Sequence, residues 1–505
     1  MSGLTDSSAV DVVVIGSGFG GSIAANRLAL AGKRVLVLER GPWRDSLPVR
    51  SMGVARRAPF PYGNKAVTHF FHSLHRGRLN LGLNKAGLFE FFDFPGLSAL
   101  AASGVGGGSL AYGGLLEAPR HPAFWQGCHP ELDPASIEGY YAKVIADMGG
   151  VLFGRDHLLP QSVWTHFPDS PAGHCRPADP QPHMAMLFPP SAAQAGATIT
   201  WGPSGVQRQY CAFDGDSFLG SRGGAKASVD FVYLAPVLDK GATVRDLCQV
   251  TRIQPCRPVD GAGYHVHFTD LATGTAAVVR AQRVVLAAGT LNTLRLLFAS
   301  AGQPDGLAAM PALGRRFFAN GDLIGLWFKS SAQASSFVSA PSHGTFAVAG
   351  HEAPTYGMGG FPGFETWPMP SFVKRKLGQT LFTYGMGSDS GKASVFLKHG
   401  HLSSDYDYRQ EPIYDDIRGA FGVIAGESGH RILASKKPVS VHAMGGACVG
   451  PDAQRGVVDH RGEIHGNPGL FVTDMSTLPM APGGPPSVAT AAWAHHVADG
   501  IVRLF

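Results

Sequence analysis

The chain has 505 residues, and its 42 Lys and Arg against 37 Asp and Glu give a formal net charge of +5 at pH 7. This length exceeds what one hydrophobic core supports and predicts two domains, while the lack of any Lys/Arg run argues against a nucleic-acid partner. No apolar run reaches the roughly 18 residues of a membrane span, and the start MSGLTDSSAV lacks a secretory signal pattern, so we expect a cytoplasmic protein without an integral membrane segment. The six cysteines show no metal-ligand spacing, which predicts reduced, packed thiols and no metal site.

The first strongly patterned segment is residues 11–41, DVVVIGSGFGGSIAANRLALAGKRVLVLERG. Residues 12–15 and 35–38 are continuous apolar runs of the kind that forms strands covered on both faces. Residues 22–30 repeat apolar side chains at helical spacing and stop at Gly32, a typical C-terminal cap. The segment therefore predicts a strand–turn–helix–strand unit.

The turn of this unit carries Gly16, Gly18 and Gly21 in GxGxxG spacing. Glycines allow the backbone to bend sharply and to approach a pyrophosphate, whose charge then lies at the positive end of the helix. Glu39 ends the second strand, where a carboxylate would accept hydrogen bonds from a ribose diol and disfavour a 2′-phosphate. Because strand, turn, helix and acid occur in register, the unit predicts an NAD- or FAD-type dinucleotide site rather than an ordinary Gly-rich turn.

A second glycine-rich segment, SGVGGGSLAYGGLL, spans residues 103–116. Its glycines permit positive φ and let backbone amides converge on a bound group. A flexible linker is the alternative interpretation, but linkers do not interleave apolar side chains such as Val105 and Leu110 among their glycines. A backbone that lies against a flat ring system fits this segment better.

Three long stretches show weaker patterns. Residues 42–96 are loop-like and contain HFFHSLH, whose histidines we expect to pack rather than bind metal, because no acidic or thiol ligand accompanies them. Residues 120–206 predict irregular structure. Residues 327–436 look like loops and strands rich in aromatic side chains and Met, which favours a wall facing the substrate.

The second half of the chain also contains a strand, a glycine turn and a helix in the order seen in residues 11–41. Residues 225–233 have helical spacing, and residues 283–287 form a buried run that ends in Ala-Gly-Thr before a helical run at 291–301. This is a second strand–glycine–helix unit, compatible with the same sheet, so the nucleotide-binding domain is predicted to be discontinuous. Further strands are predicted at residues 242–253, 264–268, 276–279 and 470–473, and a last helix at 488–504.

Several blocks in the same order resemble the glucose–methanol–choline (GMC) oxidoreductases, nearest the cholesterol oxidase-like branch. The blocks are the opening fingerprint, SGVGGGSLAYGG, GAKASVDFVYLA, VVLAAGTLNTLRLL, the NGD segment at 320–322, and HAMGGACVG followed by GVVDHRGEIHGNPGLFVTDMSTLP. The resemblance implies an α/β fold: a discontinuous Rossmann-like FAD-binding domain and a β-sheet-based substrate-binding domain. We place the first at residues 1–60, 100–120, 207–325 and 437–505, and the second, as a cover, at 61–99, 121–206 and 326–436.

The resemblance also implies which residues bind FAD. Gly16, Gly18, Gly21 and Glu39 would hold the ADP half, and Val250 would offer its backbone to adenine. The remaining residues implied to contact the cofactor are Phe19, Gly20, Arg40, Gly106, Gly107, Gly108, Ser109, Tyr112, Gly113, Ala288, Gly289, Asp474 and Pro485.

For catalysis, His442 matches the active-site histidine of the family. Removal of a hydride from an alcohol carbon requires the hydroxyl proton to leave as well, and a positioned imidazole can accept that proton near neutral pH. Glu365, in FPGFETWP, resembles the glutamate base of the cholesterol oxidase branch, and aromatic neighbours would raise its pKa. A loop glutamate that faces water is the alternative. The implied reaction is oxidation of a hydroxyl on an apolar alcohol (sterol-, terpenoid- or long-chain-like) by hydride transfer to flavin N5, with O2 or another electron acceptor.

One position departs from the family. An Asn or His normally follows the last Gly-rich turn and hydrogen-bonds the substrate oxygen, whereas this chain has Pro485, which has no donor. His442 would then act with another group, such as Glu365, His495 or His496, or the alcohol reaction would be slow or specialised. A non-oxidative lyase or isomerase on a flavin scaffold, or a non-catalytic FAD-binding protein, are the alternative functions.

Overall fold

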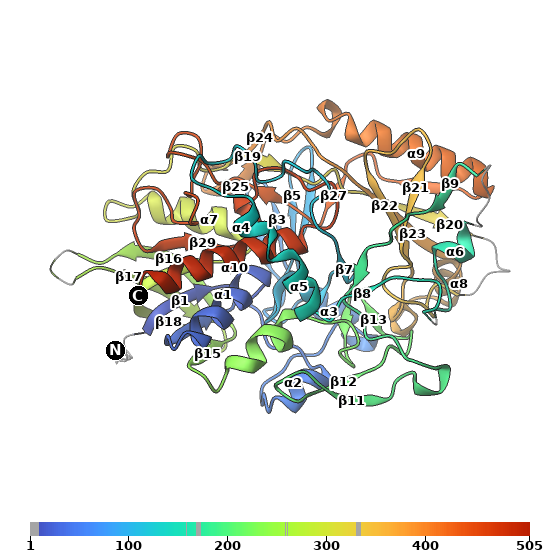
Figure 1. The fold of residues 1–505 in the computed structure, drawn as a ribbon, viewed down its shortest axis with the longest axis horizontal. Coiled ribbons are helices and arrows are strands. Elements are labelled where there is room, and N and C mark those ends of the chain that lie inside the picture. The colour runs from blue at the N-terminus through green and yellow to red at the C-terminus, as the bar shows by residue number, and fades with distance from the viewer. Residues whose placement is uncertain (1–9, 158, 168–172, 258, 260, 330–334) are drawn as a thin grey trace.

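The computed structural model describes residues 10–157, 159–167, 173–257, 259, 261–329 and 335–505 (Figure 1). Three larger sheets organise these residues. The first, here called the mixed sheet, has seven strands in the order β15-β2-β1-β18-β17-β16, with β29 beside β18. Its strands are β1 (Val10–Ile15), β2 (Val35–Leu38), β15 (Ala242–Arg245), β16 (Cys248–Pro255), β17 (Tyr264–Asp270), β18 (Thr275–Leu286) and β29 (Leu470–Val472).

The mixed sheet joins distant parts of the chain. β15, β2, β1, β18 and β29 run parallel, while β16, β17 and β18 form antiparallel pairs. The sequence predicted separate strands at 276–279 and 283–287, but the structure has one strand, β18, because no turn-forming residue interrupts VVRAQRVV. One half of β18 therefore pairs with β17, and the other lies between β1 and β29.

Three helices flank the mixed sheet: α1 (Phe19–Leu30), α7 (Thr290–Ala301) and α10 (Ser487–Arg503). α1 and α10 pack side by side, and α7 packs against β16 (Figure 1). α1 begins at Phe19, earlier than predicted, because the helix follows the glycine turn directly. The helix predicted at 225–233 is instead a short π-helical segment at Asp230–Leu234.

The second sheet, here called the antiparallel sheet, has six strands in the order β26-β20-β23-β22-β21-β9. They are β9 (Cys175–Pro177), β20 (Leu323–Phe328), β21 (Thr345–Val348), β22 (Thr355–Gly359), β23 (Thr380–Met386) and β26 (Ile432–Ala434). Buried and exposed residues alternate along β20, so at this strand one face of the sheet is covered and the other is open. α9 (Ile413–Ser428) packs on this sheet at the end of the molecule away from the mixed sheet (Figure 1).

α9 corrects the prediction that 327–436 holds only loops and strands, as does α8 (Ser371–Gly378). α9 buries Tyr414, Ile417, Ala420, Phe421 and Ile424, which recur at helical spacing. Pro412 precedes the first turn and Gly429 ends the helix in the left-handed conformation.

A third sheet has five strands in the order β27-β6-β5-β3-β4. Its strands are β3 (Phe71–Arg76), β4 (Leu79–Gly82), β5 (Phe89–Asp93), β6 (Ser98–Ala102) and β27 (Val439–Ser440). The histidines of HFFHSLH lie in and beside β3, and no group of three metal-ligating side chains is found in the part of the chain that the structure describes. Within that same part, no helix combines the length and apolarity needed to cross a bilayer.

The remaining helices and strands are short or peripheral. They are α2 (Leu47–Ser51), α3 (Ala66–His69), α4 (Ala135–Glu138), α5 (Tyr141–Asp147), α6 (Val163–His166), β7 (Leu115–Leu116), β8 (Val151–Leu152), β10 (His183–Met184), β11 (Thr198–Trp201), β12 (Val206–Gln209), β13 (Asp216–Ser217), β14 (Gly220–Ser221), β19 (Arg315–Phe318), β24 (Ala393–Lys398), β25 (His401–Ser404) and β28 (Met444–Gly445).

Candidate active site and cofactor cavity

A cavity of about 760 Å³ lies between the mixed sheet and the antiparallel sheet and is lined by residues from both. Its volume is within the usual range for small-molecule and cofactor sites. Most of the residues predicted from the sequence to bind a cofactor line it: Gly16, Gly18, Phe19, Gly20, Glu39, Arg40, Gly107, Gly108, Tyr112, Gly113, Val250, Ala288, Gly289, Asp474 and Pro485.

Gly21, Gly106 and Ser109 do not line the cavity. A Cβ on Gly21 would lie 2.0 Å from the Gly16 carbonyl oxygen, so this glycine allows α1 to pack on the turn after β1. The Ser109 hydroxyl donates to the Gly106 carbonyl and accepts from the Val229 amide, which braces the second glycine segment from behind.

The two glycine segments touch each other at the cavity wall. A Cβ on Gly107 would lie 2.6 Å from Gly18 Cα, and Gly107 has a φ of +52°, a conformation that side chains other than glycine rarely adopt. On the other side of the turn, a Cβ on Gly16 would lie 2.3 Å from the Ala287 carbonyl oxygen. Glycine is therefore required for two backbones to form one cradle.

Three helices begin at this cavity: α1 after Gly18, α7 after Gly289 and α10 after Pro486. Neither Gly18 nor Pro486 provides a capping side chain. The first amides of α1 and α10 therefore donate no hydrogen bond to a side chain of the cap residue. At α7, the Asp474 carboxylate accepts from the Gly289 amide at 2.9 Å. Convergent helix N-termini attract anions, which fits a diphosphate.

Glu39 lies at the end of β2, as predicted, with its carboxylate buried at the cavity. One oxygen accepts from the Ser17 amide at 3.0 Å and from the Ser17 hydroxyl at 2.8 Å, and the other accepts from the Gly41 amide at 2.8 Å. Burial raises the pKa of Glu39, although these hydrogen bonds act in the opposite direction. Glu39 thus ties the glycine turn to the end of β2.

The neighbouring Arg40 belongs to a buried ion network. Its guanidinium makes two hydrogen bonds with Glu90, at 3.0 and 2.6 Å. Glu90 is fully buried and also accepts from Asn292, while Arg295 lies 3.8 Å away. Arg40, Asn292 and Arg295 all line the cavity, so Glu90 holds three polar side chains in one wall.

The opposite wall is apolar and comes from the open face of the antiparallel sheet. Ile324 pairs with Tyr384 and Leu326 pairs with Phe382 across β20 and β23, and all four line the cavity. Phe361 joins this wall, and its ring centroid lies 5.6 Å from that of Phe382. The cavity therefore has a polar end of glycines and helix termini and an apolar end of aromatic and aliphatic side chains.

His442 lines the cavity together with Asp322. Its Nδ1 lies 3.0 Å from Asp322 Oδ1, and the Asn320 side-chain nitrogen lies 3.5 Å from the same ring atom. Asn320 also donates to the Gly484 carbonyl at 3.2 Å, beside Pro485. Sequence reasoning noted the NGD segment only as part of the resemblance and missed the carboxylate partner of His442.

Glu365 is not brought to the cavity. It lies in a short 3-10 helix, Phe364–Thr366, in which Phe364 lines the cavity and Glu365 does not. Burial raises the pKa of Glu365, as predicted for a carboxyl among aromatic rings. Its catalytic role stays a prediction, because the structure gives its carboxyl no place in the cavity wall. His495 and His496 also lie outside the wall, and His495 stacks on Tyr140.

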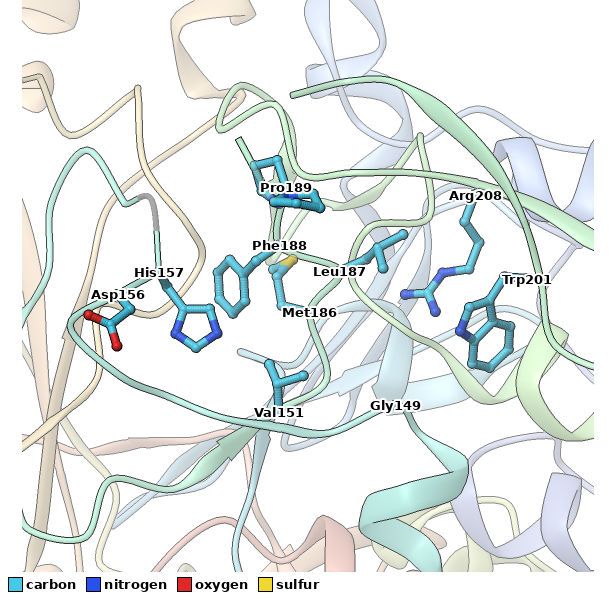
Figure 2. Close-up of a pocket in the computed structure, with 11 residues that line it drawn as sticks. Gly149, Val151, Asp156, His157, Met186, Leu187, Phe188, Pro189, Trp201 and Arg208 are labelled. Atoms are coloured by element: carbon cyan, nitrogen blue, oxygen red, sulfur yellow. The ribbon is translucent and has the colours of Figure 1, made fainter. Parts of the chain in front are cut away.

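A smaller pocket of about 310 Å³ lies elsewhere, beside β8, β11 and β12 (Figure 2). Figure 2 shows Arg208 next to Trp201 at one end and His157 next to Phe188 at the other. The Arg208 guanidinium donates to the Gly224 and Ala225 carbonyls, so it is held by backbone. This pocket has no glycine cradle, and its His157 contacts the Gly154 backbone and the Phe188 ring.

The residues of the larger cavity fit FAD. Thr290 Oγ1 and Arg40 Nε are buried polar atoms without a hydrogen-bond partner among the described residues, and both residues line the polar end. Such atoms are normally satisfied, which points to a polar group bound there. The fold and the cavity define an FAD-dependent oxidoreductase.

Family models agree with this class. The FAD binding domain model matches residues 11–62, and the GMC oxidoreductase models match residues 183–319 and 425–494. The chain belongs to the GMC oxidoreductase family, in its cholesterol oxidase-like branch, and is an FAD-dependent alcohol oxidase or dehydrogenase.

Similar proteins extend over nearly the whole chain. A cholesterol oxidase of Acinetobacter baumannii is 25% identical, covering 96% of this chain and 93% of its own. A paromamine 6'-oxidase of Streptomyces fradiae is 25% identical over 97% and 91%, and a long-chain-alcohol oxidase of Arabidopsis thaliana is 21% identical over 98% and 67%. Among solved structures, pyridoxine 4-oxidase from Mesorbium loti matches with a TM-score of 0.58 at 18% identity, covering 97% of this chain and 99% of its own. That likeness is one of fold.

Proposed function

We propose that this enzyme oxidises a hydroxyl group on an apolar alcohol, sterol-, terpenoid- or long-chain-like, with His442 as the group that accepts the hydroxyl proton. The observation that carries the proposal is that a single cavity has a glycine cradle at one end, an apolar sheet face at the other, and His442 in its wall. When bound, FAD supplies the acceptor for the hydride of the alcohol carbon at flavin N5. The residues that would hold it are those of the polar end.

The apolar substrate class is supported by the open face of the antiparallel sheet. Ile324 is 38% exposed and Leu326 is 37% exposed, although both are large aliphatic side chains that burial would stabilise. An apolar substrate that covers them would gain roughly 25 cal/mol for each Å² removed from water. Relatives are named for a sterol, for paromamine and for long-chain alcohols, so the family name alone does not select an apolar substrate.

The role of His442 is supported by its place and by its partner. An imidazole in the cavity wall can accept the proton that an alcohol hydroxyl loses when its carbon is oxidised. Pro485 lines the same cavity and has no donor, so it cannot hold the substrate oxygen. His442 is then the residue that removes the proton. Because position 485 has no group that could bind the substrate oxygen, a non-oxidative reaction is tested as well.

We also propose the two domains expected from the sequence. The mixed sheet is built from segments placed in the FAD-binding domain, and most of the antiparallel sheet lies within 326–436. The five-stranded sheet crosses the division: β3, β4 and β5 lie in the cover, β27 lies in an FAD-binding segment, and β6 spans the boundary between residues 99 and 100.

The test is anaerobic mixing of the purified holoenzyme with 1-dodecanol, geraniol, cholesterol and, as polar controls, glucose and methanol. Loss of the visible flavin absorbance with apolar alcohols and not with the controls supports the proposal. Bleaching by the polar controls alone overturns the substrate class. Turnover of any compound with the flavin still yellow indicates the lyase or isomerase alternative. Admission of air then shows whether O2 restores the absorbance and acts as the acceptor, and repetition with His442→Ala tests the base.

A further inference from the structure

Among the carboxylates that line the cavity in the described residues, Asp322 accepts the most hydrogen bonds. It is 3% exposed. Its Oδ2 accepts from the Ser440 hydroxyl at 3.0 Å, from the Val441 amide at 2.9 Å and from the His442 amide at 3.1 Å. Its Oδ1 accepts from His442 Nδ1 at 3.0 Å and from the Asn320 side-chain nitrogen at 3.3 Å. The two oxygens therefore have separate partners: two backbone amides and the Ser440 hydroxyl at Oδ2, and the imidazole and the Asn320 side chain at Oδ1.

These contacts decide which nitrogen of His442 carries the hydrogen. A carboxylate oxygen only accepts hydrogen bonds, so at 3.0 Å Nδ1 is the donor to Asp322. The Asn320 side-chain nitrogen, 3.5 Å from Nδ1, has nearer acceptors for its two hydrogens in Asp322 Oδ1 at 3.3 Å and the Gly484 carbonyl at 3.2 Å. Neutral His442 then presents Nε2 with a free lone pair, and among the described residues no hydrogen bond occupies that atom. A basic Nε2 is what removal of a hydroxyl proton requires, since the O–H bond breaks as the N–H bond forms.

We propose that Asp322 is a positioning residue that keeps His442 in the Nδ1–H tautomer and stabilises the imidazolium formed when Nε2 takes the proton. The inference rests on the proposed function of His442. It adds that Asp322 compensates for the hydrogen-bond donor that Pro485 lacks. A second group that would hold the substrate oxygen is absent at position 485, and a carboxylate behind the imidazole makes complete proton removal favourable instead. Asp322 acts through His442.

The pattern of partners makes Asp322→Asn a sharp test. Three donors, two of them backbone amides, point at Oδ2, so the amide oxygen of the new side chain must occupy that position. Its NH2 group then faces His442 Nδ1 and forces that atom to accept. The substitution preserves size and removes the charge, and it reverses the tautomer so that Nε2 carries the hydrogen and cannot accept a proton.

The matched control is Asp389→Asn. Asp389 is also buried, at 7% exposure, and accepts from the Ala319 amide and from the Tyr406 hydroxyl. It neither contacts His442 in the described residues nor lines the cavity. The control therefore removes a buried carboxylate that is bonded to Ala319, the residue before Asn320, without a change at the imidazole.

The first readout needs no substrate. Histidines are labelled with ¹⁵N in the holoenzyme, and His442→Gln identifies the His442 signal in long-range ¹H–¹⁵N spectra at about pH 9, above the ordinary titration of histidine. We expect the Nδ1–H tautomer in the wild type and in Asp389→Asn, and the Nε2–H tautomer in Asp322→Asn. An Nε2–H wild type, or an unchanged tautomer in Asp322→Asn, overturns the inference. The wild-type spectrum tests the inference even if the Asp322→Asn variant fails to fold.

The second readout is the rate of anaerobic flavin bleaching by 1-dodecanol, per bound flavin. Asp322→Asn should slow it by about 10²–10⁴-fold, the range over which a positioned base acts, with the KM within a fewfold of wild type. Asp389→Asn should stay within about twofold. If His442→Ala bleaches as fast as wild type, the proposed function fails. If His442→Ala is slow while Asp322→Asn is not, only the positioning role fails.

Discussion

The contact between Gly18 and Gly107 provides the most direct test of the cofactor cradle. In Gly107→Ala, the new methyl group would lie 2.6 Å from Gly18 Cα and 3.1 Å from Gly18 N. The obstacle is backbone, so no side chain can rotate away. The residue also has a φ of +52°, which an alanine adopts only with strain. Either the glycine segments separate or the strained loop persists.

The free-energy cost of Gly107→Ala has two parts, the backbone conformation and the close contact. A left-handed conformation costs a residue other than glycine about 1–2 kcal/mol, and overpacking of a close contact costs about 1–3 kcal/mol. Together they amount to about 2–5 kcal/mol. If the loop moves instead of storing the strain, the cradle opens and the same energy weakens FAD binding, by about 30-fold to several thousand-fold.

Two measurements check this expectation: titration of apoprotein with FAD, followed by flavin fluorescence, and the unfolding midpoint with and without FAD. Gly422→Ala is the control, because Gly422 lies within α9 and a Cβ there meets open space. Alanine in a helix interior should stabilise by up to about 1 kcal/mol and leave FAD affinity unchanged. A Gly107→Ala protein that binds FAD within twofold of wild type and unfolds at the same midpoint would refute the reasoning.

Three further predictions concern carboxylates. Glu365→Gln should leave anaerobic flavin bleaching within about twofold, because Glu365 is outside the cavity wall; a loss above about 10²-fold would restore its predicted role as a base. Glu90→Gln should lower the free energy of unfolding by about 3–5 kcal/mol, since Arg40 would keep a buried charge without a partner; a denaturant midpoint equal to wild type contradicts this. Burial raises the pKa of Asp389 to about 7, above its ordinary 3.8, so the folded state binds more protons between these values and stability falls as pH rises from about 4 to 7. Asp389→Asn lacks this loss and should gain up to about 4 kcal/mol on wild type across that range in urea unfolding; parallel pH curves would exclude it.

Local chemistry explains which parts of the fold the sequence could predict. The turn between β1 and α1 depends on glycines within a few residues of one another, and Glu39 follows at the end of the next strand, so the pattern is short and complete. β2 was predicted with its observed ends for the same reason. The sequence analysis did not predict α9 because the interpretation of 327–436 relied on aromatic content, although Tyr414, Ile417 and Ile424 have the spacing of a buried helical face.

The candidate site shows more clearly what a single sequence cannot predict. His442 and Asp322 are separated by 120 residues along the chain and meet at 3.0 Å, because β20 begins beside the segment that follows β27. No periodicity links such residues, so a single sequence carries no signal for the pair. Glu365 shows the reverse error: the aromatic residues around it predicted a buried carboxyl, and burial does raise its pKa, but the sequence could not tell which side of the 3-10 helix faces the cavity.

Pro485 and Pro486 together give a physical reason for a carboxylate behind His442. Both line the cavity at the start of α10, and neither has an amide hydrogen, so this helix start offers no donor from side chain or backbone at these two positions. A substrate oxygen that develops negative charge beside Pro485 would therefore find no hydrogen-bond donor on that residue. The charge is avoided if the proton is removed completely as the carbon is oxidised, which demands a base whose protonated form is itself stabilised. Asp322, held by three donors on its far oxygen, supplies that stabilisation from the side of the imidazole away from the substrate.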